Sequence, residues 1–181
     1  MWVQVALHFL VLPLFILVVS RRIFRAFLKM SKEDEVVCSQ RFNRAIIAIT
    51  FVYGGFTTIV QAYDANISIA TTHDSAVYWI WGTIVFYVFD CILLAVYRQF
   101  NVSMWIHHLL AISLFYTSVA FDKGHVGCMI ALLAEALVPW GFLLFFFRAM
   151  QWTFSLWFQL VFFFFFFFFL FVISFRCVVE E

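Results

Sequence analysis

Charged residues are scarce in this chain of 181 residues, where they make up 12% of the sequence against 66% hydrophobic residues. A soluble domain is roughly one quarter charged, because water must solvate its surface. This scarcity excludes a water-soluble globular protein and indicates that lipid covers most of the surface. The few basic residues are needed to explain membrane topology, so no basic face remains and nucleic-acid binding is excluded.

Cysteine is also sparse, and its pattern is uninformative. The four cysteines stand singly, with no C-x-x-C pair, at Cys38, Cys91, Cys128 and Cys177. This spacing argues against a thiolate metal centre and against a disulfide framework. Two adjacent histidines, His107 and His108, do not converge on one ion from one helix face, so no metal site is predicted either. We expect no bound cofactor.

Long apolar runs dominate what is present. A hydrocarbon core about 30 Å thick is crossed by roughly 20 helical residues. Six stretches of about that length occur, at residues 2–20, 45–62, 76–97, 104–121, 126–147 and 152–175. The fourth and fifth are joined by a short polar turn, Asp122 to His125, which predicts an antiparallel hairpin. The sequence therefore predicts an all-α, polytopic transmembrane helix bundle of about six spans.

The basic residues predict how the bundle lies in the membrane. Cytoplasmic loops carry an excess of Lys and Arg. The first loop holds seven of them, namely Arg21, Arg22, Arg25, Lys29, Lys32, Arg41 and Arg44. Placing it in the cytoplasm puts nine of the eleven Lys and Arg residues on that side. We interpret residues 1–35 as an N-terminal anchor helix with a basic cytoplasmic loop, and residues 36–181 as a transmembrane domain with both chain ends luminal.

Ionisable residues inside the spans are the candidates for function, because a charge at the bilayer centre costs at least about 2.5–3.5 kcal/mol. Asp90 lies in the third span, His107 and His108 open the fourth, and Glu135 is in the fifth. Asp90 and the histidines lie at similar depths below one short loop, within about 5 Å along the helix axes. One histidine can then face Asp90 while the other faces a neighbouring helix or a cavity.

Two interpretations of these residues stay open. Asp90 could orient a histidine that serves as general base or nucleophile. The same pair could instead only fix helix packing. Pro139 and Gly141 follow Glu135 and loosen that helix, which favours a polar cavity there. We expect this cavity to lie between the third, fourth and fifth spans, with Asp90, His107, His108 and Glu135 around it. Arg148 is predicted to anchor the cytoplasmic end of the fifth span at the head groups.

The order of these motifs resembles the TLC family of membrane proteins. The resemblance rests on the segment Phe86 to Leu94 with its Asp90, on Ile106-His107-His108, and on Glu135 and Arg148 on either side of a proline, and it covers roughly residues 40–176. TLC proteins include ceramide synthases and small proteins linked to membrane lipid composition. Members continue into a further helix near the C-terminus, so the resemblance raises C-terminal truncation as a hypothesis.

The resemblance implies a protein of sphingolipid or acyl-lipid metabolism in the endoplasmic reticulum or another endomembrane, with membrane lipids as partners. If it is an enzyme, the implied reaction is N-acyl transfer from acyl-CoA, as co-substrate, to a long-chain base. His107 or His108 would be the base or nucleophile, Asp90 would orient it, and Glu135 would line the cavity. The alternative is a non-enzymatic regulator of membrane composition or a cargo receptor. A channel is disfavoured, because no internal repeat is evident.

Overall fold

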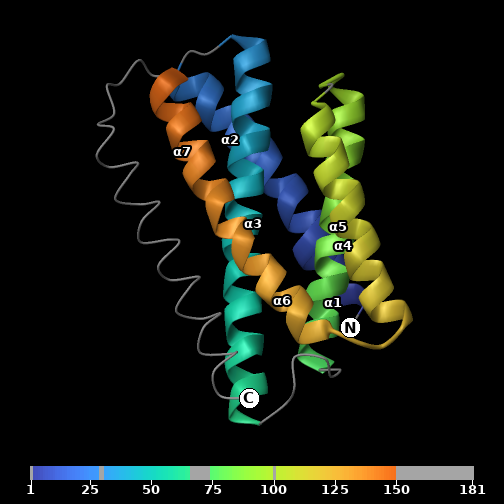
Figure 1. Ribbon diagram of the computed structural model, residues 1–181. Coiled ribbons are helices and arrows are strands. Elements are labelled where there is room, and N and C mark those ends of the chain that lie inside the picture. The colour runs from blue at the N-terminus through green and yellow to red at the C-terminus, as the bar shows by residue number, and fades with distance from the viewer. Residues whose placement is uncertain (1, 29–30, 66–73, 100, 150–181) are drawn as a thin grey trace. The chain divides into compact units, whose positions relative to one another are not determined.

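A computed structural model describes residues 2–28, 31–65, 74–99 and 101–149 of the chain, and every regular element in these ranges is helical (Figure 1). The elements are α1 (Trp2–Ala6), η1 (Leu7–Val11, a π-helical turn), α2 (Leu12–Leu28), α3 (Lys32–Asp64), α4 (Asp74–Val96), α5 (Val102–Ala120), α6 (His125–Leu133), η2 (Ala134–Ala136, a 3-10 turn) and α7 (Leu137–Ala149). The predicted all-α class is confirmed.

Five of the predicted spans correspond to helices that are long and apolar enough to cross a membrane. These are Trp2–Ala26, Lys32–Asp64, Ser75–Val96, Val102–Ala120 and His125–Phe146. The predicted sixth span, residues 152–175, lies outside the described residues. The chain divides into two compact units, Met1–Phe142 and Leu143–Glu181. Of the second unit the structure describes residues 143–149, the last turns of α7.

The basic segment predicted as the first loop is mostly helical, which corrects the sequence-based boundary. α2 continues to Leu28 and α3 begins at Lys32, so Arg44 lies inside a membrane helix. The Ser31 side chain caps α3 by accepting a hydrogen bond from the Asp34 backbone N–H, at 3.1 Å. Three acidic residues in the first turn favour the helix through its dipole.

Arginines from α2 neutralise the buried acid of that turn. Glu35 is 1% exposed and accepts hydrogen bonds from Arg21 Nε at 3.1 Å and from Arg25 Nε at 2.8 Å. α2 and α3 therefore meet through an ion-pair cluster near the end of α2 and the start of α3. Arg25 remains 63% exposed, so the cluster reaches the surface of the molecule.

Glycines allow the closest approaches between helices of the first unit. A Cβ built on Gly54 of α3 would lie 2.2 Å from the Trp79 ring of α4, and one on Gly82 of α4 would lie 2.3 Å from the Phe9 ring. A Cβ on Gly55 would lie 2.8 Å from the Met129 backbone oxygen of α6. Small residues at these positions let the helices approach closely, as is typical of membrane helix packing.

Replacing Gly54 with alanine is expected to cost about 1–3 kcal/mol, because the added methyl overlaps the Trp79 ring and forces α4 outward. Gly141→Ala is the matched control, since no described atom lies within 4 Å of the place that its Cβ would take. Thermal unfolding in detergent micelles measures both variants. Equal midpoints for Gly54→Ala and Gly141→Ala would contradict this close packing of α3 against α4.

The predicted hairpin between the fourth and fifth spans is present between α5 and α6. α5 ends at Ala120 and α6 begins at His125. Gly124 has φ of 70°, a left-handed conformation that favours glycine. The Ser118 hydroxyl donates to the Lys123 carbonyl at 2.6 Å and ties the turn to the end of α5. This hairpin fixes the α5 histidines relative to η2.

Candidate functional site

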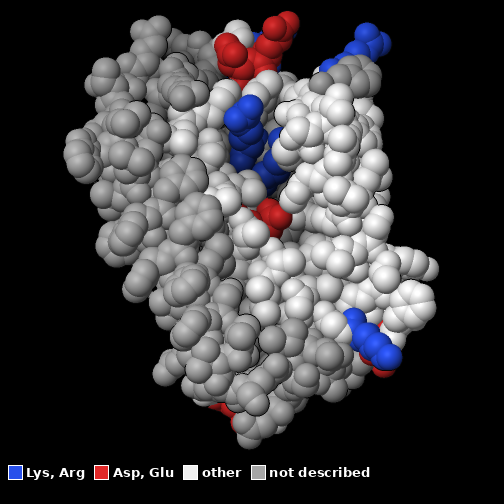
Figure 2. Space-filling view, viewed as in Figure 1, with Lys and Arg blue, Asp and Glu red and all other residues white. Residues whose placement is uncertain are grey.

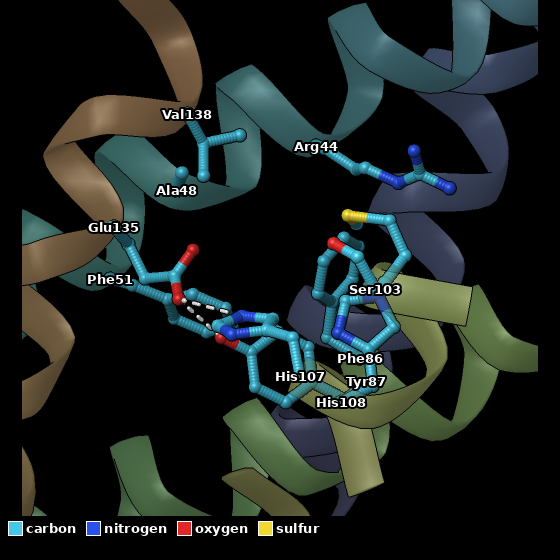
Figure 3. Close-up of a pocket in the computed structure, with 11 residues that line it drawn as sticks. Arg44, Ala48, Phe51, Phe86, Tyr87, Ser103, His107, His108, Glu135 and Val138 are labelled. Atoms are coloured by element: carbon cyan, nitrogen blue, oxygen red, sulfur yellow. Dashed lines mark hydrogen bonds and ion pairs between the residues drawn. The ribbon is translucent and has the colours of Figure 1, made fainter. Parts of the chain in front are cut away.

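A cavity of about 270 Å³ lies among α3, α4, α5, η2 and the start of α7 (Figure 3). Its walls are largely apolar, with a few convergent polar groups, as is typical of small-molecule sites. The lining residues are Arg44, Ala48, Phe51, Phe86, Tyr87, Ser103, Met104, His107, His108, Glu135 and Val138. Figure 2 shows basic and acidic atoms inside a hollow of an otherwise mostly uncharged face.

Asp90 of α4 and His108 of α5 form the buried pair that the sequence predicts. The His108 Nε2 atom lies 2.7 Å from Asp90 Oδ2, and the two side chains are 3% and 1% exposed. Asp90 precedes the short connection between α4 and α5, and His108 follows it at a similar distance along the chain. The two side chains therefore lie at a similar depth in the membrane. The predicted contact between Asp90 and the histidine pair is confirmed for His108.

Arg44 of α3 completes this pair, and sequence reasoning misses it. Its Nε atom donates to both Asp90 carboxylate oxygens, at 2.9 and 2.8 Å, and its side chain is 13% exposed. The charge count assigns Arg44 to the cytoplasmic loop, because basic residues mark loops. Ser31 followed by three acidic residues is a helix-start signal. This signal could have placed Arg44 three turns inside a helix.

His107 faces a different partner, Glu135 of η2. The His107 Nε2 atom lies 3.5 Å from Glu135 Oε1, and the Tyr87 hydroxyl of α4 donates to the same oxygen at 2.5 Å. Figure 3 shows both interactions meeting at the Glu135 carboxylate. Tyr87 belongs to the α4 motif, but the sequence predicts no role for it. The expectation that the two histidines face different surroundings is confirmed.

Stacked rings connect the two pairs. The Tyr87 ring lies nearly parallel to the His108 ring, with centroids 4.6 Å apart and planes 23° apart. The same ring meets His107 edge-on, at 5.7 Å and 68°. Tyr87 therefore packs between the Arg44–Asp90–His108 group and the His107–Glu135 group. We call these six residues the polar cluster.

Tyr87→Phe is expected to cost about 1–3 kcal/mol, because Glu135 loses its short hydrogen bond and keeps only the longer contact with His107. Tyr116→Phe is the control, since Tyr116 is 58% exposed on α5. Equilibrium unfolding in micelles compares the two. A Tyr87→Phe protein as stable as Tyr116→Phe would show that the hydroxyl does not hold Glu135.

The hydrogen bond to Asp90 determines which His108 nitrogen is available for chemistry. A carboxylate only accepts hydrogen bonds, so His108 donates from Nε2 and its Nδ1 atom carries the lone pair in the neutral ring. Among the described residues His108 Nδ1 has no hydrogen-bond partner. The Nδ1 atom is buried, and a lone pair oriented by a carboxylate on the far nitrogen can serve as a general base once a substrate reaches it.

The helix break near Glu135 follows from Pro139. Proline lacks the N–H that would bond the carbonyl four residues earlier, which here belongs to Glu135. The chain is a 3-10 turn at that point, Ala134–Ala136, before α7 begins. The predicted loosening of this helix is confirmed. The Glu135 side chain, which lies in the 3-10 turn, lines the cavity.

Two expectations about the cavity need correction. Asp90 is not among its lining residues and lies 1% exposed behind His108. The second predicted span, α3, contributes Arg44, Ala48 and Phe51 to the wall, whereas the sequence predicts a cavity between the third to fifth spans alone. Arg148 falls in α7, but its side chain lies outside the described residues.

No protein-family model, curated protein or solved structure matches this chain. The resemblance to the TLC family therefore stays a prediction. Any inference about function rests on the residues of the polar cluster and on the cavity beside them.

Proposed function

We propose that this chain is a TLC-type membrane protein that handles acyl lipids within the bilayer of the endoplasmic reticulum or another endomembrane. Its sixth span would be residues 152–175. The observation that carries this proposal is the buried Arg44–Asp90–His108 group beside a cavity of about 270 Å³. Ionisable groups are rare in membrane helices and are commonly functional there.

The reaction that suits this geometry is N-acyl transfer from acyl-CoA to the amine of a long-chain base. The amine nitrogen attacks the thioester carbonyl, the C–N bond forms, and the C–S bond breaks to release the CoA thiol. His108 Nδ1 accepts the proton that leaves the amine and returns it to the thiolate. Asp90 holds the ring orientation, and Arg44 holds Asp90.

Purified protein in lipid nanodiscs, given labelled acyl-CoA and a sphingoid base, is expected to form an N-acyl product. The product should disappear in His108→Ala, and His107→Ala should reduce it less. Absence of turnover from folded wild-type protein, across a panel of amines and acyl-CoAs, would overturn the enzymatic proposal.

The size of the cavity favours a second candidate, a non-enzymatic regulator of membrane composition or a cargo receptor. A volume of about 270 Å³ lies just below the roughly 300–1,000 Å³ of typical small-molecule pockets. This space holds a head group or a short chain segment, but not two complete lipid substrates together. Saturable lipid binding without product formation in the nanodisc assay would support this candidate.

In the proposed topology the segment between α2 and α3 lies in the cytoplasm, and cysteine labelling tests this orientation. Cys38 is 0% exposed and is therefore unsuited to accessibility labelling. Glu33 is exposed in the first turn of α3, so Glu33→Cys is the better reporter. Labelling of Glu33→Cys only from the luminal side would reverse the proposed topology.

A further inference from the structure

A column of buried polar side chains runs along one side of α3, outside the cavity. Ser39 and Asn43 follow Glu35 at intervals of four residues, and Gln40 precedes Arg44 by the same interval. Residues three or four apart are neighbours on a helix surface. Ser39, Gln40 and Asn43 are 0%, 1% and 1% exposed. We call Ser39, Gln40, Asn43 and Arg44 the α3 polar column.

The column holds six polar atoms without a partner in the part of the chain that the structure describes. They are Ser39 Oγ, both amide atoms of Gln40, both amide atoms of Asn43, and Arg44 Nη2. Buried polar groups in proteins are paired with protein atoms or with ordered water, because an unpaired group loses its hydration without compensation. Six such atoms side by side call for a ligand that both donates and accepts hydrogen bonds.

The two ends of the column differ in their surroundings. At the outer end Glu35 is held by Arg21 and Arg25, and Arg25 is 63% exposed to solvent. At the inner end Arg44 donates to Asp90, which accepts from His108. One turn beyond Asn43 the same side of the helix presents Ile47, an apolar residue that is 1% exposed. The polar path therefore turns from Asn43 to Arg44 and ends at the Asp90 carboxylate.

We propose that the α3 polar column binds a chain of internal water molecules that links the Glu35 cluster to the Arg44–Asp90 pair. Water is the ligand because the unpaired groups are neutral amides and a hydroxyl, with one additional guanidinium donor. A bound cation would find no free carboxylate here, since Glu35 is already paired with two arginines. The nine residues from Glu35 to Arg44 rise about 13–14 Å along the helix axis and pass half a turn around it, so the path needs at least about five waters at ~2.8 Å spacing.

Such a water chain would let protons exchange between solvent and the Arg44–Asp90 pair by a route other than the cavity. Ser39, Gln40 and Asn43 do not line the cavity, so this path does not use the cavity wall until it reaches Arg44. The proposal is independent of acyl transfer, because hydration of the column does not require that His108 is catalytic.

Water-edited solid-state NMR of the full chain in lipid bilayers tests the proposal. Magnetisation transferred from water protons should reach the side-chain amides of Gln40 and Asn43 several-fold faster than the methyl groups of Ile47. Ile47 is the matched control, because it has the same burial as Asn43 on the same helix side. Resonances are assigned by their loss in Gln40→Leu and Asn43→Leu. Transfer to the Gln40 and Asn43 amides as slow as to Ile47 would overturn the proposal.

A second measurement separates water from lipid. Asn43→Leu should slow water transfer to the Gln40 amide several-fold by interrupting the chain, whereas Ile47→Leu should leave it unchanged. Where Asn43→Leu does not fold, the wild-type comparison of Asn43 with Ile47 decides. Faster transfer to these amides from lipid protons than from water protons would show that a lipid group fills the column, and would also overturn the proposal.

Discussion

Asp90→Ala is expected to lower the free energy of unfolding by about 3–5 kcal/mol, the cost of leaving a buried charge without its partner. Asp90 is 1% exposed and accepts both from Arg44, which is 13% exposed, and from His108, which is 3% exposed. Its removal leaves a guanidinium facing apolar surroundings, and it also takes away the acceptor that orients the His108 ring.

Steric trapping or denaturant unfolding in micelles measures this loss. Asp64→Ala is the control, because Asp64 is exposed at the end of α3, where surface substitutions stay within about 0.5 kcal/mol. The double variant Arg44→Leu/Asp90→Leu should recover most of the stability, since it leaves no buried charge behind. An Asp90→Ala protein within about 1 kcal/mol of Asp64→Ala, well below the cost of an unpaired buried charge, would contradict a buried ion pair between Arg44 and Asp90.

The membrane helices are predictable because hydropathy and length alone define them. The residues at which these helices begin and end are less predictable. The sequence indicates a loop from Arg21 to Arg44 because charge normally marks the aqueous phase, yet α2 and α3 extend into this segment. Glu35 pairs with Arg21 and Arg25, and Asp90 pairs with Arg44, so these charges are compatible with helix packing. A sequence shows a charge but does not show its partner.

The candidate site is partly predictable for a similar reason. Asp90 and His108 lie on consecutive helices joined by a short connection, so counting from that connection gives their common depth. Arg44 and Asp90 are separated by 46 positions, and Tyr87 and Glu135 by 48. Those contacts depend on how the helices rotate about their axes and pack against one another, which nearly all-round apolar sequences leave undetermined. The cavity volume depends on the same rotations.

The polar cluster also explains why the two adjacent histidines are not equivalent. They project about 100° apart on α5. His108 is 3% exposed and has a 2.7 Å contact with Asp90, whereas His107 is 51% exposed and has a 3.5 Å contact with Glu135. Of the two, His108 has the carboxylate at hydrogen-bond distance that fixes its ring and leaves Nδ1 free among the described residues.

His108→Gln is therefore expected to reduce N-acyl transfer by about 10²–10⁴-fold, the range for loss of a positioned general base. The loss should appear in kcat rather than in KM, because the ring acts on the amine proton in the transition state. His107→Gln is expected to have a smaller effect that falls mainly on KM, because His107 lines the cavity but is 51% exposed and contacts its carboxylate partner only at 3.5 Å, too far to fix the ring firmly. Turnover in nanodiscs, normalised to folded protein, measures both.

The comparison between these two variants distinguishes a catalytic His108 from a His108 that only holds helices together. If His108 only holds α4 against α5, then His108→Gln lowers stability while turnover per folded molecule is unchanged. Equal losses of kcat in both variants would instead contradict the role assigned to Asp90, since Asp90 contacts His108 and His107 pairs with Glu135. A kcat loss confined to His108→Gln, in protein whose unfolding midpoint matches His107→Gln, would place the base at His108 Nδ1.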